Sequence, residues 1–504
     1  MSGAELPSSL GGEGPSEPRA EPELPREDWS DLGLLARAAA RFTGWAERWI
    51  PDAFVFALAA TFLVVIASIV TLRGAHGVVG AASKTVEIWG SGFWELLPFT
   101  LQMALVIITG YVVATTRPVY RAIAALAGLP RSPRPAIAMV ALFAMASSWL
   151  NWGFSLIFSA MLAKEVARRL EGVDYRALAA SAFLGLGSIW AQGLSGSAAL
   201  QMATPSALQP SVRQIVDAGG KVPGGIIPLS NTIFLWQSLV SVVVEVALVS
   251  VLVYAYAPDA KRARTAAMMG IDLGASPLDR ADPPRKGTPG EWLEHVPWLN
   301  VAFVALAGAY LVQYFAKSGQ GLNALNLNTI NLLFLTVGVA LHGTPARLMR
   351  AVKEATPGVW GVILQFPFYA GIAALVVKTH LNETIASWFV GISTPRTFPA
   401  IIAIYSAVLG VFVPSGGSKW VIEAPYVMQA AHDLRVHLGW MVAVYDLGEA
   451  LANLVQPFWM LPILGLFNLR ARDVMGYTFL VFIALVPVVL VLVTLLGATL
   501  PYPL

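Results

Sequence analysis

The chain has 504 residues, of which 56% are apolar and only 12% are charged, and its formal net charge is +3. Soluble globular domains are about 45–50% apolar and about 25% charged, so this composition excludes a soluble protein. The small net charge gives no indication of a nucleic-acid partner, and the absence of cysteine excludes disulfides, a thiol nucleophile and Cys-ligated zinc.

The apolar residues form continuous runs rather than the alternating segments of about ten residues that build a β-barrel. They predict an all-α polytopic membrane protein. An acidic tail rich in Pro, Gly and Ser, without the features of a signal peptide, is expected to be disordered over residues 1–30. A first membrane half (31–257) and a second membrane half (298–504) follow, joined by a polar linker at 258–297 that is expected to lie in the cytoplasm.

The first half begins with an amphipathic segment at 31–50, and its full spans are expected at 52–72, 94–116, 176–202 and 231–257. The spans of the second half are expected at 298–315, 322–342, 357–377, 438–466 and 476–497, which gives about nine spans in all. Basic residues with no acid among them follow the second span, namely Arg117, Arg121, Arg131 and Arg134. Cytoplasmic loops carry an excess of Lys and Arg, so this side of the membrane and the N-terminus are expected to be cytoplasmic.

Two pairs of short apolar arms stand apart from these spans. The arms of the first pair, within 135–165, are 13–15 residues long, or about 20–23 Å as helix, against about 30 Å of hydrocarbon. Basic residues flank this pair on both sides, which favours a re-entrant hairpin that enters and leaves by the cytoplasmic face; two ordinary spans are the alternative. A second pair at 397–431 surrounds a similar break at 413–419.

The two halves carry an internal repeat, in which residues 101–153 resemble 364–417. Pro133-Arg134 matches Pro395-Arg396, and the break at 151–153 matches the break at 415–417. The opening helix of the first copy is expected to run from outside to inside, and that of the second copy from inside to outside. Inverted repeats of this kind are typical of secondary transporters.

The two hairpin tips are candidate binding elements. The second arm of each hairpin begins at the break, where free N–H groups and the positive end of the helix dipole suit a carboxylate; the first arm ends in free carbonyls, which suit Na⁺. Kinks that only pack small residues between helices are the alternative. The tips contribute the predicted substrate-binding residues Ser148, Asn151, Gly153, Ser155, Ser415, Gly416, Gly417, Ser418 and Lys419.

Two further breaks are expected in long apolar stretches, at 193–198 and 453–457. Gly and Ser at high density weaken a helix, and Pro457 removes a backbone donor. These discontinuous helices are expected to face the hairpin tips, although close packing of small residues would give the same pattern. They add Gly193, Ser195, Ser197 and Asn453 to the predicted substrate-binding residues.

Charged residues within the apolar zone are few. Lys419 either holds the substrate carboxylate, or pairs with Glu423 or Glu449, or lies at the membrane surface if its hairpin is shallow. Asp446 and Glu449 are spaced i, i+3 and share a helix face; they either carry a coupling proton or help hold Na⁺, or they form a structural ion pair. Glu245 stands alone on an apolar helix, which favours a domain-interface or oligomer role. The coupling-ion candidates are Asn151, Ser415, Asp446, Glu449 and Asn453.

No HExxH, Walker loop, GxGxxG or Gly-x-Ser-x-Gly motif is present, and the six histidines lie at segment ends or in loops. The sequence therefore gives no support for an enzyme or for ATP-driven transport. No cofactor is expected, and Na⁺ as a coupling ion is the one metal that the sequence leaves open.

Several segments together resemble the bacterial AtoE-type short-chain fatty acid transporters, over residues 40 to 500. They are Trp49–Phe56, Trp152–Ile157, Gly193–Ala198, Val413–Gly417 and Gln456–Trp459. The resemblance implies uptake of short-chain monocarboxylates such as acetoacetate and butyrate across the bacterial inner membrane. The wider ion-transporter superfamily implies inverted repeats, paired re-entrant hairpins, and an elevator-like division between a transport domain (135–202 and 397–466) and a scaffold, often in homodimers.

The chain departs from that family pattern at Trp190–Gly193, at Ala199 and at the Ser418-Lys419 pair. A cation in the site would favour a more anionic substrate. We therefore expect a secondary transporter of short-chain monocarboxylates coupled to H⁺ or Na⁺, with a small organic anion and membrane lipid as partners. A carrier of dicarboxylates or other organic anions is the first alternative, and an anion channel is the second.

Overall fold

The computed structural model describes residues 53–258, 260, 263–273, 287–319, 321–413, 415–456 and 458–504. The predicted tail at 1–30, the segment at 31–50, Pro414, Pro457 and part of the linker lie outside these residues. The described residues form helices and no strand. Eight of the helices are long and apolar enough to cross a membrane, counted over the described residues alone. The prediction of an all-α polytopic membrane protein is confirmed.

The first half contains eleven regular segments that bear on the site or surround it. They are α2 (Ala53–Gly92), α3 (Leu97–Ala114), α4 (Arg117–Ala127), α5 (Pro133–Leu150), α6 (Trp152–Arg169), α7 (Tyr175–Leu184), a π-helix (Gly185–Ile189), a 3₁₀ turn (Trp190–Gln192), α8 (Ser197–Ala203), α9 (Pro210–Asp217) and α10 (Trp236–Tyr256).

The second half begins with four helices that contribute no residue to the site described below, and the helices that do contribute come after them. The helices are α11 (Pro289–His295), α12 (Trp298–Ser318), α13 (Leu327–His342), α14 (Pro345–Ala355), α15 (Trp360–Lys378), α16 (Leu381–Ile392), α17 (Phe398–Phe412), α18 (Gly416–Asp433), α19 (Leu438–Asn453), α20 (Leu461–Phe467) and α21 (Ala471–Gly497).

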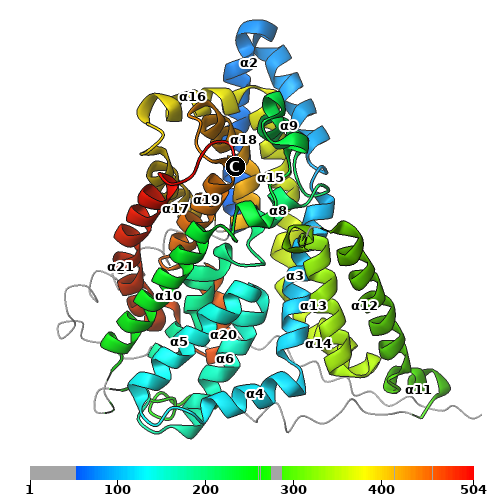
Figure 1. Ribbon diagram of the computed structural model, residues 1–504, viewed down its shortest axis with the longest axis vertical. Coiled ribbons are helices and arrows are strands. Elements are labelled where there is room, and N and C mark those ends of the chain that lie inside the picture. Colours follow the sequence, from blue (N-terminus) through cyan, green and yellow to red (C-terminus); the bar gives the residue numbers. More distant parts are fainter. Residues whose placement is uncertain are drawn as a thin grey trace, which may run out of the picture.

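The element order of the first half recurs in the second. A span (α3, α15) is followed by a short helix (α4, α16), two arms (α5 and α6, α17 and α18) and an interrupted helix (α7 to α8, α19 to α20). Figure 1 shows α4 at the lower end of the molecule and α16 at the upper end, so the two copies have opposite orientations. Because no membrane is present, re-entrance of the two arm pairs stays a prediction.

Helix α2 is longer than the sequence pattern predicts. The span was expected at 52–72, where an apolar run ends before Arg73, but helical structure continues over 40 residues to Gly92, with a kink at Gly77, whose φ is +66°. Its second part has a stripe of buried small or apolar positions at helical spacing, including Ala81, Thr85 and Ile88. This stripe packs against α15, and that contact stabilises helix where the composition alone would end it.

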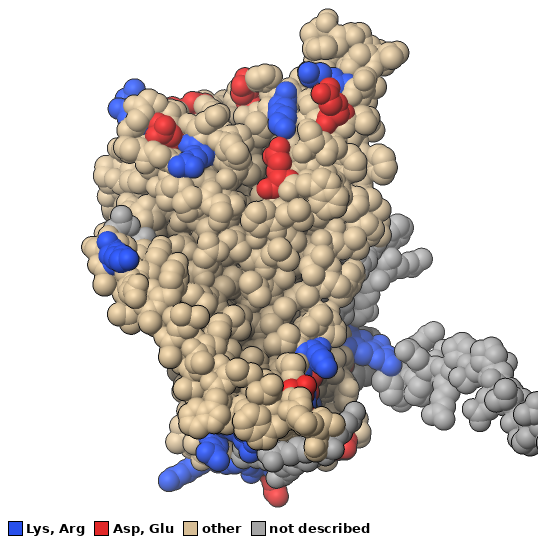
Figure 2. Space-filling model, turned by 90° about the vertical axis from the view of Figure 1, so that its right-hand side faces the viewer, with Lys and Arg blue, Asp and Glu red and all other residues tan. Residues whose placement is uncertain are grey.

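Charged residues gather toward the two ends of the molecule. In Figure 2, Lys, Arg, Asp and Glu lie at the top and bottom of the face shown, with a band of mostly other residues between them. At one end, Asp174 caps α7 by accepting from the N–H groups of Arg176 and Ala177, both at 3.0 Å. The Asp174 carboxylate also accepts from the N–H of Arg264 at 3.0 Å. This bond attaches the linker segment 263–273 to the first half.

Candidate functional site

A partly open pocket lies where the two interrupted helices and the start of α18 meet. The space between its atoms, part of which is open to solvent, is about 360 Å³. Helices α3 and α15 form one wall and the interrupted elements form the other. Its lining residues are Met103, Trp152, Leu186, Trp190, Ser197, Val362, Phe366, Ser415, Gly416, Gly417, Asn453 and Trp459.

The first break is bonded to the tip between α5 and α6. The N–H of Leu194 donates to the Trp149 carbonyl at 2.7 Å, and the N–H of Trp152 donates to Ser195 Oγ at 2.9 Å. A Cβ added to Gly193 would lie 2.1 Å from the Trp149 carbonyl oxygen. Gly193 is therefore required for the close approach of the two backbones. Ser195 accepts a hydrogen bond from the backbone N–H of Trp152 at the tip. Neither residue lines the pocket.

The second break is bonded to the first. Asn453 is the last residue of α19, and its Nδ2 donates to the Leu186 carbonyl at 3.0 Å. Asn453 Oδ1 accepts from Gln456 Nε2 at 2.9 Å. Because Asn453 also lines the pocket, one side chain joins both interrupted helices at the pocket wall.

The first tip bonds some of its own polar groups, whereas Ser148 Oγ and Asn151 Nδ2 are buried without a hydrogen-bond partner among the described residues. Asn151 separates α5 from α6, and its Oδ1 caps α6 by accepting from the N–H of Phe154 at 2.8 Å. Ser155 Oγ donates to the Ala144 carbonyl of the opposite arm at 2.8 Å. A Cβ on Gly153 would lie 3.2 Å from the Val106 carbonyl of α3. Ser148, Asn151, Gly153 and Ser155 are absent from the pocket lining, so their contact with substrate stays a prediction.

The second tip differs, because the start of α18 has no side-chain cap. Ser415 Oγ shares a hydrogen bond of 2.6 Å with Ser418 Oγ, in which either oxygen is able to donate. The first N–H groups of any α-helix lack a partner within the helix. Since Ser415, Gly416 and Gly417 line the pocket, the positive end of α18 faces this space.

The remainder of the pocket wall is apolar and aromatic, and none of its described lining residues is charged. The ring centroids of Trp152 and Trp459 are 5.5 Å apart, and those of Trp152 and Trp190 are 6.4 Å apart. Trp190 belongs to one of the segments in which the sequence departs from the family pattern. A helix N-terminus beside an aromatic wall suits a ligand with one anionic end and a short apolar chain.

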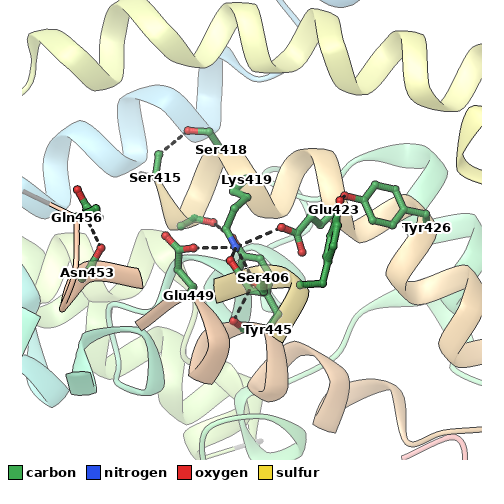
Figure 3. Close-up of polar contacts among 12 residues, drawn as sticks. Ser406, Ser415, Ser418, Lys419, Glu423, Tyr426, Tyr445, Glu449, Asn453 and Gln456 are labelled. Atoms are coloured by element: carbon green, nitrogen blue, oxygen red, sulfur yellow. Dashed lines mark hydrogen bonds and ion pairs between the residues drawn. The ribbon is translucent and has the colours of Figure 1, made fainter. Parts of the chain in front are cut away.

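Lys419 lies outside the pocket lining, in a fully buried ionic cluster (Figure 3). Its ammonium Nζ is 2.7 Å from Glu449 Oε2 and 3.2 Å from Glu423 Oε1. It also donates to the carbonyl of Ser406 at 2.8 Å and to the hydroxyl of Ser406, and it lies 4.5 Å from the centre of the Tyr445 ring. Of the three arrangements that the sequence left open for Lys419, the structure has the paired one.

Asp446 contacts different neighbours from Glu449, although the i, i+3 spacing predicted one shared face. Its carboxylate accepts from the N–H of Ala199, and it lines a separate cavity of about 210 Å³. Gln192 lines the same cavity and donates from Nε2 to both carboxylate oxygens of Glu245, each at 3.1 Å. Glu245 of α10 is buried inside the chain against the first broken helix, and its expected role at a domain interface or in an oligomer contact stays a prediction.

Sequence reasoning did not single out Ser406, Tyr445, Met103, Leu186 or Phe366, which complete the cluster and the pocket. Ser406 had a usable signal, since it is the single serine on an arm that is otherwise apolar or aromatic. The others are common residue types in a membrane helix, and only tertiary contacts distinguish them.

The two copies place equivalent residues in equivalent contacts. The fourth residue of the second arm is Ser155 in α6 and Lys419 in α18, and each bonds a carbonyl of the first arm, that of Ala144 or that of Ser406. A Cβ on Gly185 would lie 2.3 Å from the Ala144 carbonyl oxygen. Gly448 makes a comparable close approach in the second copy, to Ala403, which lies three residues before Ser406. The backbone is therefore repeated, whereas the charge is present in one copy only.

Ser195→Ala is expected to lower the free energy of unfolding by about 1–3 kcal/mol, because the buried N–H of Trp152 loses its acceptor. Thermal unfolding in detergent measures this. Ser387→Ala is the matched control: Ser387 Oγ bonds Thr384 on an exposed helix, and its loss is expected to cost less than about 0.5 kcal/mol. Equal stability of the two variants would contradict the assigned role of Ser195.

Interrupted apolar helices that meet at a pocket define a membrane transporter of small solutes. Residues 34–496 match the profile of the family described as "Short chain fatty acid transporter". A protein of Escherichia coli (strain K12), provisionally named a short-chain fatty acid transporter, is 36% identical over 448 residues, which are 88% of this chain and 96% of that protein. A protein of the same name from Haemophilus influenzae is 33% identical over 459 residues, covering 91% and 99%. The chain belongs to the short-chain fatty acid transporter family.

Two solved structures share the fold at low identity. The YdaH transporter of Alcanivorax borkumensis has a TM-score of 0.57 and 17% identity, and the match covers 90% of this chain and 99% of that one. MtrF of Neisseria gonorrhoeae, described with a class of antimetabolite efflux pumps, has a TM-score of 0.56 and 15% identity, covering 92% and 97%. The family resemblance read from the sequence is confirmed, and these two structures agree with the fold class.

Proposed function

We propose that this protein is a secondary active transporter that carries short-chain monocarboxylates, of the acetoacetate and butyrate class, on an H⁺ or Na⁺ gradient. The observation that carries the proposal is the uncapped start of α18 on the wall of a pocket without charged lining residues. The substrate carboxylate would accept from the N–H groups of Gly416 and Gly417, and its alkyl end would lie against Trp152, Trp459 and Phe366.

The same geometry weighs against the alternatives. A dicarboxylate carrier needs a second cationic group facing the substrate, and Lys419, the residue that favoured it, is buried against two carboxylates of its own. An anion channel needs a continuous polar path, whereas the lining here is mostly aromatic and apolar. Saturable accumulation against a gradient would separate a carrier from a channel.

The proposal includes alternating access by an elevator-like movement. The pocket lies between α3 and α15 on one side, which supply Met103, Val362 and Phe366, and the interrupted elements on the other. That division supports a transport domain of 135–202 and 397–466, with re-entrant hairpins, moving against the rest. We further propose a homodimer in the bacterial inner membrane with a cytoplasmic N-terminus.

Uptake of labelled acetoacetate into proteoliposomes tests this function. Acetoacetate is preferred to butyrate because it is the stronger acid, so that less of it crosses the bilayer unaided in the neutral form. Protein-free vesicles measure that leak. Saturable uptake and exchange with internal unlabelled acetoacetate are expected; their absence with folded protein would overturn the proposal.

Ser415→Asp is expected to reduce acetoacetate uptake at least tenfold. The introduced carboxylate would cap α18 and occupy the position proposed for the substrate anion, while a negative group at a helix N-terminus stabilises the helix. Initial uptake rates and thermal unfolding together measure this. Ser132→Asp places the same group at the exposed, uncapped start of α5, where uptake is expected to be retained. Normal uptake by Ser415→Asp would contradict the substrate position.

A further inference from the structure

The ionic cluster of Lys419, Glu423 and Glu449 contains one cation and two acids, and all three side chains are fully buried. An unbalanced charge away from water is costly, so buried ions are paired or become neutral. The ammonium of Lys419 balances one carboxylate. The second carboxylate therefore requires a proton or another cation whenever the cluster is closed off from water.

The oxygen atoms around the ammonium are those that would otherwise bind a monovalent metal ion. They comprise two carboxylates, the carbonyl of Ser406 and the hydroxyl of Ser406. Because Nζ of Lys419 already occupies the centre of this set, the cluster has its cation built in. The remaining charge is then balanced by a proton on a carboxylate oxygen rather than by Na⁺.

The cluster lies directly behind the proposed substrate position. Lys419 is in the first turn of α18, and the Tyr445 hydroxyl donates to the carbonyl of Gly416. A Cβ on Gly416 would lie 3.3 Å from Cγ of Glu449. An anion bound at the start of α18 therefore adds negative charge beside Glu449, which shares the ammonium of Lys419 with Glu423. A proton on Glu423 offsets that added charge.

We propose, on the basis of the proposed function, that the cluster of Lys419, Glu423 and Glu449 is the proton-binding site of an electroneutral symporter that moves one H⁺ with each monocarboxylate. Glu423 takes the proton, since Glu449 makes the shorter contact with the ammonium. The proton binds a carboxylate oxygen of Glu423 while the site is open to one side, and leaves it after the substrate departs on the other. Net charge movement per cycle is zero.

The groups that face Glu423 and Glu449 come from three helices. They are Tyr405 of α17, Lys419 and Tyr426 of α18, and Tyr445 and Asp446 of α19. Asp446 is held by the N–H of Ala199 of α8. Helices α9, α15 and α16 also pack near α18. Their described charged side chains Arg213, Lys378 and Glu383 are exposed, and the half-buried Asp217 at the end of α9 accepts from the N–H of Gly224 at 2.9 Å. Of the two described acids that pair with Lys419, Glu423 has the longer distance to the ammonium, 3.2 Å against 2.7 Å for Glu449.

Three gradients imposed on the same proteoliposomes test the proposal with labelled acetoacetate. An inwardly directed proton gradient is expected to drive accumulation at least tenfold above protein-free vesicles. A Na⁺ gradient and a membrane potential set with K⁺ and valinomycin are each expected to change the rate less than twofold. A pH dye inside the vesicles is expected to report one proton per acetoacetate. Accumulation driven by Na⁺ or by the potential would overturn the inference, while saturable exchange would still support the proposed function.

Glu423→Gln is expected to reduce proton-driven accumulation of acetoacetate at least tenfold. Exchange of external labelled for internal unlabelled acetoacetate needs no net proton movement and is expected to remain measurable. Glu95→Gln is the control, because Glu95 is a half-exposed acid paired with Lys378. Full proton-driven accumulation by Glu423→Gln would contradict the assignment of Glu423. If this variant does not fold, the proton-to-substrate ratio and the response of the unmodified chain to the membrane potential still decide the proposal.

Discussion

Lys419→Met is expected to lower the free energy of unfolding by about 3–5 kcal/mol, because it leaves two buried carboxylates without their cation. The ammonium is within 3.2 Å of both Glu423 and Glu449, and all three side chains are fully buried. Removing one member of such a group leaves charge without a partner, whereas methionine replaces the volume but no ion pair. The measurement is thermal unfolding in detergent, followed by intrinsic tryptophan fluorescence at neutral pH.

Lys378→Met provides the matched control. Lys378 forms a single ion pair of 3.1 Å with Glu95, and both side chains are more than two-fifths exposed. Exposed pairs contribute about 0–1 kcal/mol, so this substitution is expected to leave unfolding nearly unchanged. A combined Lys419→Met, Glu423→Gln and Glu449→Gln variant is expected to regain stability without regaining proton-driven uptake. Equal stability of the two single variants would show that the cluster is not the buried ionic group described.

Gly193→Ala is expected to reduce uptake at least tenfold and to destabilise the chain. The added Cβ would lie 2.1 Å from the Trp149 carbonyl oxygen, so a backbone rather than a flexible side chain would have to move. Overpacking costs about 1–3 kcal/mol even where side chains yield. The displaced segment carries Ser195, which bonds the first tip, and it leads to Ser197 on the pocket wall. Initial uptake rate and thermal unfolding measure the two effects.

Gly465→Ala tests the same change at an uncrowded position. Gly465 lies in α20, beyond the second break, and no heavy atom stands within 4 Å of an added Cβ. Alanine also has the higher helix propensity, so stability is expected to stay the same or rise slightly. If Gly193→Ala transported as well as Gly465→Ala, the tight contact between the first break and the first tip would have no functional importance.

The breaks could be predicted because their cause is local. Gly193 to Ser197 and Asn453 to Pro457 concentrate residues that favour interruption of a helix. The helical run that begins with α7 and continues through the π-helix and the 3₁₀ turn ends at Gln192, and α19 ends at Asn453. The single-residue tip at Asn151 and the start of α18 at Gly416 follow the same logic. The lengths of the arms were underestimated, since α5 and α6 each extend over 18 residues.

The contacts between segments could not be predicted from composition. Glu423 lies four residues after Lys419 on the same helix, and Glu449 lies on another helix. Nothing in the sequence indicated that Lys419 binds both acids. Asn151 and Ser155 were predicted to bind substrate because they lie at a tip. Asn151 Oδ1 and the Ser155 hydroxyl are instead bonded inside the first tip, while Asn151 Nδ2 stays without a partner there. Polar residues near a break satisfy the backbone in some cases and the ligand in others, and the choice depends on tertiary packing.

The equivalence of Ser155 and Lys419 has a kinetic consequence. If the two tips served as the gates of a carrier, an exact repeat would give them equal energies. Here the first tip is held to its arm by a hydroxyl–carbonyl bond and the second by ions. In a cycle of alternating access, half-saturation for the substrate would then differ between the two membrane faces, and acidity would shift the opening of the ionic gate far more than that of the neutral one. Microscopic reversibility forbids such an imbalance from setting the net direction of flow, so the maximal rates in the two directions must differ in compensation.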